Sequence, residues 1–276
     1  MNFIDKELDL TVPRVMGILN VTPDSFSDGG QFNRLDDALR QTERMLHEGA
    51  DFIDVGGEST RPGAKDVPQQ EELDRVVPVI EAISQRFDTI VSIDTSKPEV
   101  MLEAVGAGAR LINDVRALQE EGALAAAAST RAAVCLMHIK GQPRTMQHEP
   151  RYGDLFGDIF SFLDDRVQAC VEVGIGQDRL MLDPGFGFGK TLQHNYQLLK
   201  GLERFHHLGF PLLVGMSRKS MIGKLLDCPV EERLAGSLAC VTIAALKGAR
   251  IFRVHDVKPT VDALRVVSAT LSPENV

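Results

Sequence analysis

Eight short apolar runs, spaced along almost the whole chain, constrain its fold more than any other feature of the sequence. None of them clearly alternates apolar with polar residues, as a strand with one face in water would. Strands that are apolar throughout are typical of parallel sheets whose two faces are both covered. The runs are Val15–Leu19, Phe52–Val55, Ile90–Ile93, Arg110–Ile112, Ala133–Met137, Leu180–Leu182, Leu212–Val214 and Ile251–Val254.

Between these runs, apolar residues recur at helical spacing. The clearest stripes lie within Leu35–Leu46, Leu73–Ile83, Leu155–Cys170 and Val257–Leu264. Ser96 is expected to cap the start of a further helix, which has Pro98 in its first turn.

Strand and helix therefore alternate eight times, which predicts an α/β protein with the (β/α)8 architecture of a TIM barrel. A doubly wound open sheet is the alternative. No Pro- or Ser-rich linker divides the chain, so we expect one domain over residues 1–276. Residues 1–13 precede the first run, and we expect them to form a small hairpin that closes the bottom of the barrel.

Polar side chains follow all eight runs at their C-terminal ends. In a (β/α)8 barrel these ends meet at one face, where the active site is built. The pattern therefore predicts an active-site mouth. The polar residues in these positions include Asn20, Glu58, Asp94, Asn113, His138, Asp183, Ser217 and His255.

Composition excludes several classes of function. The net charge of −9, the absence of Trp and the presence of only two Tyr residues argue against a nucleic-acid surface. No run of 18 apolar residues and no export leader are present, so no membrane association is expected. The four cysteines form no C-x-x-C pair, and we expect them to be reduced in a cytoplasmic protein.

The last two runs end in residues suited to an anionic group. Arg253 and His255 are two residues apart, so their side chains point the same way from a strand. The preceding run leads into residues 217–220, Ser-Arg-Lys-Ser, at an expected helix start. These two loops of a barrel commonly bind phosphate. Asp and Asn beside such a site favour Mg²⁺, which takes few protein ligands and bridges substrate oxygens.

Carboxylate and amide groups that could hydrogen-bond to the edge of a flat polar heterocycle are supplied by Asp94, Asn113 and Asp183. Two carboxylates could instead form a glycosidase pair or hold a metal. After Asp183 the chain enters a glycine-rich loop that is neither a P-loop nor a dinucleotide fingerprint. We expect its glycines to allow close approach of a flat or charged group, with Phe186 and Phe188 beside it.

These residues together resemble dihydropteroate synthase of folate biosynthesis, in its bacterial single-domain form, over essentially the whole chain. The motifs that carry the resemblance span residues 16–30, 54–63, 92–96, 112–114, 182–190, 215–220 and 253–256. The resemblance implies that 6-hydroxymethyl-7,8-dihydropterin diphosphate is joined to 4-aminobenzoate by dissociative loss of diphosphate, at a site where sulfonamides compete. It also implies a homodimer packed through the late helices.

The resemblance further assigns residues to three subsites. The pterin would be held by Asp94, Asn113, Asp183 and Lys219, with Met137 and Gly215 lining the slot. The diphosphate would be held by Asn20, Arg253 and His255 together with Mg²⁺, with Asn20 as the metal ligand. The aminobenzoate would be framed by Thr60, Arg61, Pro62, Phe188, Ser217 and Lys219. Asn20, Arg253, His255 and Lys219 would be the catalytic residues.

Two long loops, 20–34 and 56–70, carry hydroxyl and charged groups without apolar periodicity, and we expect them to act as lids. A related pterin-binding barrel, that of the methyl-tetrahydrofolate methyltransferases, is the alternative function. A catalytically silent pterin or phosphate binder is a third. Residues 60–62 and 217–219 favour the synthase, and replacement of Arg253 by Ala is expected to lower turnover strongly with the fold intact.

Overall fold

The apolar runs form the strands of a parallel barrel in the computed structural model. The structure describes all residues except 23–30, 60–65, 142–145, 147–149 and 276. Neighbouring strands pair in the order β8-β7-β6-β5-β4-β3-β10-β9, and every pair is parallel. A bridge between Leu182 and Leu212 brings the two ends of this sheet together. The strands are β3 (Arg14–Asn20), β4 (Phe52–Gly56), β5 (Ile90–Asp94), β6 (Leu111–Asp114), β7 (Ala133–Met137), β8 (Leu180–Asp183), β9 (Leu213–Val214) and β10 (Ile251–Val254).

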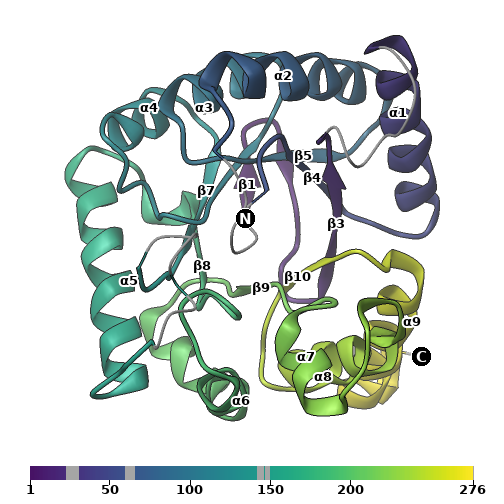
Figure 1. The fold of residues 1–276 in the computed structure, drawn as a ribbon, viewed down its shortest axis with the longest axis vertical. Coiled ribbons are helices and arrows are strands. Elements are labelled where there is room, and N and C mark those ends of the chain that lie inside the picture. The colour runs from purple at the N-terminus through teal and green to yellow at the C-terminus, as the bar shows by residue number, and fades with distance from the viewer. Residues whose placement is uncertain (23–30, 60–65, 142–145, 147–149, 276) are drawn as a thin grey trace.

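The barrel prediction is therefore confirmed, and the open sheet is excluded. α-Helices surround the barrel (Figure 1) and cover the outer faces of the strands. They are α1 (Gln31–His47), α2 (Gln69–Arg86), α3 (Pro98–Gly106), α4 (Ala123–Ser129), α5 (Leu155–Glu172), α6 (Leu192–Lys200), α7 (Ser220–Leu226), α8 (Leu234–Leu246) and α9 (Val257–Leu271). Short 3-10 turns lie at Gln177–Arg179, Leu202–Leu208, Val230–Glu232 and Pro273–Asn275.

Helix α5 illustrates why these segments are helical. Its buried residues recur every three or four positions, from Leu155 through Ile159 and Leu163 to Val167, and form one apolar stripe against the barrel. Asp154 caps its start, because the side-chain Oδ1 accepts a hydrogen bond from the backbone N–H of Phe156 at 3.1 Å.

The predicted cap at Ser96 is wrong. Lys97 occupies the N-cap position of α3, because Pro98 is already the first helical residue. Ser96 therefore lies one residue too early, and its hydroxyl donates instead to the buried carboxylate of Asp114. The start of α3 is thus tied to the strand β6 by a side chain that does not cap the helix.

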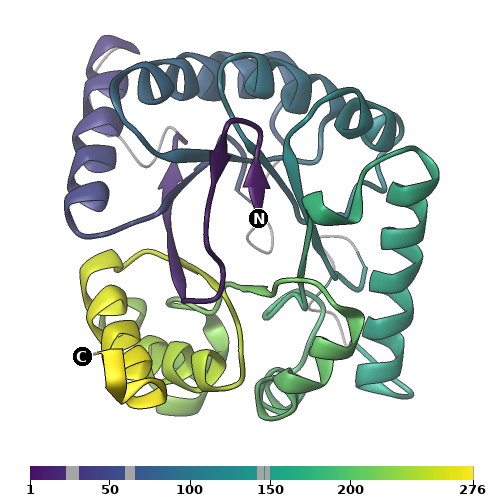
Figure 2. The same cartoon turned by 180° about the vertical axis from the view of Figure 1, so that it is seen from behind.

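The expected N-terminal hairpin is present. Strands β1 (Asn2–Phe3) and β2 (Lys6–Glu7) pair antiparallel and lie across the opening of the barrel that faces the viewer in Figure 2. The Phe3 ring is fully buried and packs edge-on against Phe52, with ring centroids 5.2 Å apart. The hairpin therefore closes the bottom of the barrel, and the opposite end carries the polar residues. None of the helices in the described ranges combines the length and apolar character needed to cross a membrane.

Candidate active site

Strand register brings the polar residues to one face. Asn20 pairs with Gly56, Gly56 with Asp94, and Asp94 with Asn113, so these positions form one row across β3 to β6. Because side chains alternate along a strand, residues in one row share the interior face. Met137 pairs with Asp183 in the same way on β7 and β8.

Arg253 connects two carboxylates at the centre of this face. Its Nε donates to Oδ2 of Asp54 at 2.6 Å, and its Nη2 donates to Oδ2 of Asp94 at 2.7 Å. Asn113 approaches Asp54 from the other side, with Nδ2 at 3.4 Å from Oδ2. Arg253, which was predicted to bind the anionic group, therefore contacts Asp94, which was predicted to bind the ring.

Asp54 is a site residue that our reading of the sequence missed. It is completely buried between apolar residues of β4, and it accepts hydrogen bonds from both Arg253 and Asn113. A carboxylate inside a buried apolar run requires a partner, because an unpaired charge there is strongly destabilising. Its position inside the run Phe52–Val55 was the feature that could have identified it.

Asp94 lies in a strongly perturbed electrostatic environment. Burial raises its pKa to about 7, against the opposing effect of Arg253, and the neighbouring carboxylates of Asp54 and Asp114 raise it further. Its second carboxylate oxygen, Oδ1, is buried and has no hydrogen-bond partner among the described residues. Buried polar atoms are almost always paired, so this oxygen is available to a ligand donor.

Asp183 ends β8 and begins the glycine-rich loop. Burial raises its pKa, while the Lys219 ammonium lowers it. Its Oδ1 accepts a hydrogen bond from the backbone N–H of Gly185 at 2.7 Å, which starts the turn of the loop. Lys219 lies across from it and donates to the backbone carbonyl of Phe186. Burial lowers the pKa of Lys219 to about 8.

The loop needs glycine at 187 to admit Lys219. Gly187 has φ of +80°, and a Cβ there would lie 3.1 Å from Cδ of Lys219. The Phe188 ring lies beneath the same ammonium, with 4.5 Å between Nζ and the ring centroid. Phe186 behaves differently from the prediction, because its side chain is fully buried in the main core and only its carbonyl reaches Lys219.

An apolar wall stands beside these polar groups. Met137 packs with Val115, Ile139 and Met146, and Phe188 lies against this cluster. Gly215 follows β9 and lies next to Arg253, whose Cβ is 3.7 Å from the position of an added Cβ at Gly215. One side of the mouth is thus apolar and the other is charged, as a flat ring with polar edges requires.

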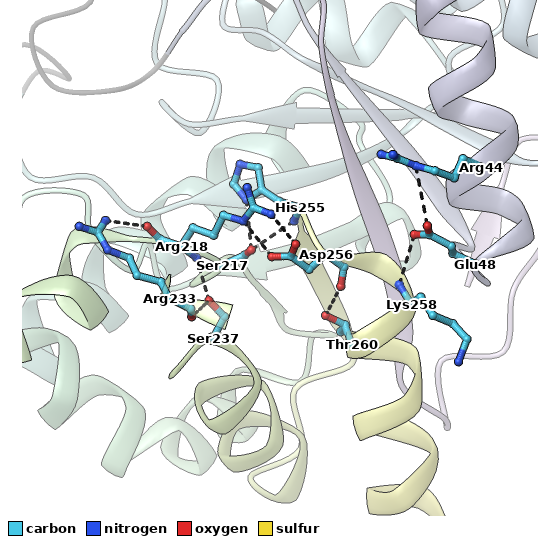
Figure 3. Close-up of polar contacts among 10 residues, drawn as sticks. All are labelled: Arg44, Glu48, Ser217, Arg218, Arg233, Ser237, His255, Asp256, Lys258 and Thr260. Atoms are coloured by element: carbon cyan, nitrogen blue, oxygen red, sulfur yellow. Dashed lines mark hydrogen bonds and ion pairs between the residues drawn. The ribbon is translucent and has the colours of Figure 1, made fainter. Parts of the chain in front are cut away.

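Ser217 and His255 meet where the loops after β9 and β10 converge (Figure 3). The Ser217 hydroxyl lies 3.1 Å from Nδ1 of His255 and accepts the backbone N–H of His255 at 3.2 Å. Arg218 turns outward from this pair and forms a two-point ion pair with Asp256, with Nε 2.9 Å from Oδ2. Ser217 and His255 therefore act as one unit between the two loops.

The remaining predictions have mixed outcomes. His138 follows β7 but does not belong to the mouth: its ring is buried against Phe162 of α5, with centroids 5.0 Å apart. The reason is the strand alternation, since the preceding Met137 takes the interior position.

Thr60, Arg61 and Pro62 lie outside the described residues, which exclude 23–30 of the first expected lid and 60–65 of the second.

Asn20 is the residue predicted to bind Mg²⁺. Its side-chain oxygen lies 3.5 Å from the position of an added Cβ at Gly56, beside Asp94. Within the described residues, no group of three His, Cys, Asp or Glu side chains could hold a metal by itself. A single amide oxygen fits Mg²⁺ that is bound mainly by substrate phosphates and water, and it does not fit a transition-metal centre.

Comparison with known proteins identifies close relatives. The chain matches the family described as pterin binding enzyme over residues 16–255. The dihydropteroate synthase of Escherichia coli K12 is 60% identical over 265 residues, which cover 96% of this chain and 94% of that protein.

Solved structures agree with this relationship. The Yersinia pestis dihydropteroate synthase in complex with a sulfonamide drug has a TM-score of 0.95 and 60% identity, over 99% of each chain. The Xanthomonas albilineans dihydropteroate synthase with 4-aminobenzoic acid has a TM-score of 0.91 and 50% identity, over 96% of this chain and 95% of that one.

Proposed function

The chain belongs to the dihydropteroate synthase family, and we propose that its barrel mouth joins 6-hydroxymethyl-7,8-dihydropterin diphosphate to 4-aminobenzoate with release of diphosphate. The protein is a transferase of that family. The observation that carries the assignment of residues is the cluster of Asp54, Asp94, Asn113 and Arg253, which combines a buried, unpartnered carboxylate oxygen with a cation.

The pterin ring is assigned to the interior of the mouth. Asp94 and Asp183 accept hydrogen bonds from the ring N–H groups, and Asn113 can both donate and accept. Met137 and Gly215 line the slot and leave room for a flat ring. Support comes from the burial of these three polar side chains beside an apolar wall.

The diphosphate is assigned to the outer part of the mouth, where Asn20, Arg253 and His255 meet it. Ser217 orients His255 through Nδ1. Arg253 keeps its charge at all relevant pH values, so it can stabilise the negative charge that grows on the departing oxygen. Mg²⁺ held by Asn20 and the phosphates would neutralise part of that charge when bound.

The aminobenzoate is assigned to the side of Phe188, Ser217 and Lys219, with Thr60, Arg61 and Pro62 completing it. The Phe188 ring offers an apolar face, and Lys219 offers a cation for the carboxylate. The 4-aminobenzoic acid in the Xanthomonas albilineans structure and the sulfonamide in the Yersinia pestis structure support a subsite of this chemistry.

The residues favour a dissociative reaction. The C–O bond to diphosphate breaks first, and its electron pair leaves with the diphosphate while the electron-rich ring stabilises the methylene cation. The amine then attacks that carbon and loses a proton. The chain contributes mainly positioning and charge stabilisation, because a cation requires no strongly activated nucleophile. No single side chain is assigned as general base.

Product formation tests this proposal directly. Purified protein is incubated with the pterin diphosphate and Mg²⁺, with and without 4-aminobenzoate, and both diphosphate and pteroate are measured. Amine-dependent release of diphosphate with formation of pteroate is expected, and chelation of Mg²⁺ should suppress both. Pterin binding without amine-dependent release would contradict the synthase assignment and favour the methyltransferase-like alternative. Full activity after chelation would contradict the role of Mg²⁺.

The protein is further proposed to work as a cytoplasmic homodimer. Large apolar side chains are exposed on the late helices α7, α8 and α9: Leu225, Leu226, Leu234, Ile243, Leu246, Val266 and Leu271. Such a group is typical of an interface. The cysteines Cys135, Cys170, Cys228 and Cys240 are free, which suits a reducing compartment. Light scattering should give twice the chain mass, and a monomeric mass would contradict the dimer.

A further inference from the structure

A buried polar cluster lies behind the glycine-rich loop, on the side away from the mouth. Lys190 is 2% exposed, and its Nζ donates to the backbone carbonyls of Gly185 at 2.8 Å and Phe188 at 3.1 Å. The same Nζ lies 2.9 Å from Nδ1 of His138, which is 4% exposed. The proposed chemistry uses neither side chain, although a buried lysine and a buried histidine are costly to retain.

The contacts of Lys190 are complete. An ammonium has three N–H donors, and the two carbonyls and the imidazole nitrogen provide three acceptors. Burial lowers the pKa of both groups, to about 2 for His138, and the charge of Lys190 lowers the pKa of His138 further. The pair therefore carries at most one positive charge, and His138 serves as a neutral partner that orients the amine.

Other groups hold the same loop from behind. Asn195 accepts the backbone N–H of Gly187 at 2.7 Å, and the Tyr152 hydroxyl donates to the carbonyl of Gly189 at 2.8 Å. The backbone is pressed against the segment after β7, since a Cβ at Gly185 would lie 1.8 Å from the carbonyl oxygen of His138. The carbonyls of residues 185, 188 and 189 are thus bonded from behind, whereas the carbonyl of Phe186 accepts Lys219 on the mouth side.

We propose that Lys190 is a positioning residue for this reaction, with His138 as its orienting partner. By fixing the carbonyls on either side of residues 186–187, Lys190 sets the place of the Phe186 carbonyl and the Phe188 ring. Those two groups in turn hold the ammonium of Lys219 opposite Asp183. The inference rests on the proposed function only in that Lys219 and Phe188 contact substrate.

Replacement of Lys190 by Met removes all three donors and keeps an unbranched side chain that is one atom shorter. We expect KM for 4-aminobenzoate to rise about 10-fold, since the lost hydrogen bonds leave the Phe188 carbonyl with no donor among the described residues and the Gly185 carbonyl with only the backbone N–H of Phe188 at 3.2 Å.

The value of kcat at saturation should change less than about 3-fold. The residues assigned to the leaving group, Arg253 and His255, lie on and after β10, and Lys190 does not contact them. Lys200→Met, at an exposed lysine of α6, is the matched control and should leave both constants unchanged.

His138 provides a second variant that keeps the test decisive if Lys190→Met does not fold. His138→Leu removes the third acceptor and should raise KM in the same direction, whereas His138→Gln restores an acceptor oxygen and should recover most of the loss. A purely structural role would lower the melting temperature of both His138 variants without separating their KM values. Equal KM values for His138→Leu and His138→Gln would overturn the proposal.

A measurement that does not depend on activity separates this inference from the proposed function. Competitive acetylation followed by mass spectrometry gives the pKa of Lys219, which burial lowers to about 8 in the intact loop. In folded Lys190→Met this value should rise toward the ordinary 10.5 as the loop loosens and water reaches the amine. An unchanged value would overturn the positioning role even if the protein proved to be no synthase.

Discussion

Nη2 of Arg253 donates to Oδ2 of Asp94 at 2.7 Å, across 159 positions of the sequence. The pair links the last strand of the barrel to the third, and it joins the two halves of the mouth. The cation that is assigned to the leaving group therefore also neutralises a carboxylate assigned to the ring. Binding and stability are therefore coupled at this contact.

Replacement of Arg253 by Ala should lower kcat about 100- to 1,000-fold, the usual effect of removing a group that stabilises developing charge. Unlike the expectation from sequence, the free energy of unfolding should also fall, by about 3 kcal/mol, because Asp54 and Asp94 lose their shared cation. Steady-state kinetics and urea unfolding measure the two effects. The double variant R253A/D54N should regain stability but not turnover, and unchanged turnover in R253A would exclude the leaving-group role.

Asp183→Asn should weaken binding of the pterin diphosphate at least about 10-fold, since hydrogen bonds to charged groups contribute roughly 1.5–3 kcal/mol. The amide can still accept the backbone N–H of Gly185, so the loop should keep its shape. Isothermal titration calorimetry gives the affinity. Asp178→Asn, at an exposed aspartate before β8, is the control, and equal affinity for both variants would remove Asp183 from the pterin subsite.

The stability of the ligand-free protein should carry a pH-dependent contribution from Asp94. Burial raises its pKa from 3.8 to about 7, so between these values the folded protein holds a proton that the unfolded chain has lost. This contribution therefore decreases as pH rises from about 4 to 7 and is constant above that range. Urea unfolding of the protein and of Asp94→Asn at several pH values measures it by difference, because groups remote from Asp94 titrate alike in both proteins. A difference that does not change with pH would contradict the raised pKa.

Gly187→Ala should lower activity by about 10-fold, because the new Cβ would press on the side chain of Lys219 at 3.1 Å. Its positive φ adds a backbone cost of about 1–2 kcal/mol. Gly174→Ala separates the two effects, since Gly174 has φ of +89° but no atom within 4 Å of the added carbon. Both variants should lose similar stability in thermal unfolding, and only Gly187→Ala should lose activity.

Phe3→Ala should destabilise the fold by about 3–5 kcal/mol, as expected for a fully buried phenylalanine. The Phe3 ring packs on Phe52 at the end of the barrel opposite the mouth, so kcat and KM should stay unchanged at temperatures where the variant is folded. Val12→Ala, at a more exposed apolar side chain, should change neither property. A large change in KM for Phe3→Ala would show that the two ends are coupled.

The fold was predictable because burial on both faces leaves a simple pattern in the sequence. The run Ile90–Ile93 is apolar apart from one serine and ends on Asp94, and this arrangement, repeated at the ends of all eight runs, predicts both the strands and the mouth. The row of Asn20, Asp94 and Asn113 follows from the same alternation once the strands are parallel.

The partners within the mouth were not predictable. Asp54 and Arg253 are separated by 199 positions, and nothing local to Asp54 indicates which cation neutralises it. Lys190 stands in a glycine-rich loop that favours exposure, yet packing turns it inward against His138. The cap at Ser96 was wrong for a similar reason, since a tertiary contact with Asp114 replaced the local one.

The N-terminal hairpin packs Phe3 on Phe52 at one end of the barrel, where a cluster of buried apolar side chains fills the interior, and the polar mouth lies at the other end. Substrates and products must therefore pass through the polar mouth, where the pterin subsite lies deeper than the aminobenzoate subsite. The pterin diphosphate, which reaches the buried carboxylates, must bind before 4-aminobenzoate fills the outer subsite. The pterin part of the product leaves last. The packed core at the hairpin end thus leaves the polar mouth as the side from which both substrates approach, and the depth of the two subsites sets the order of binding.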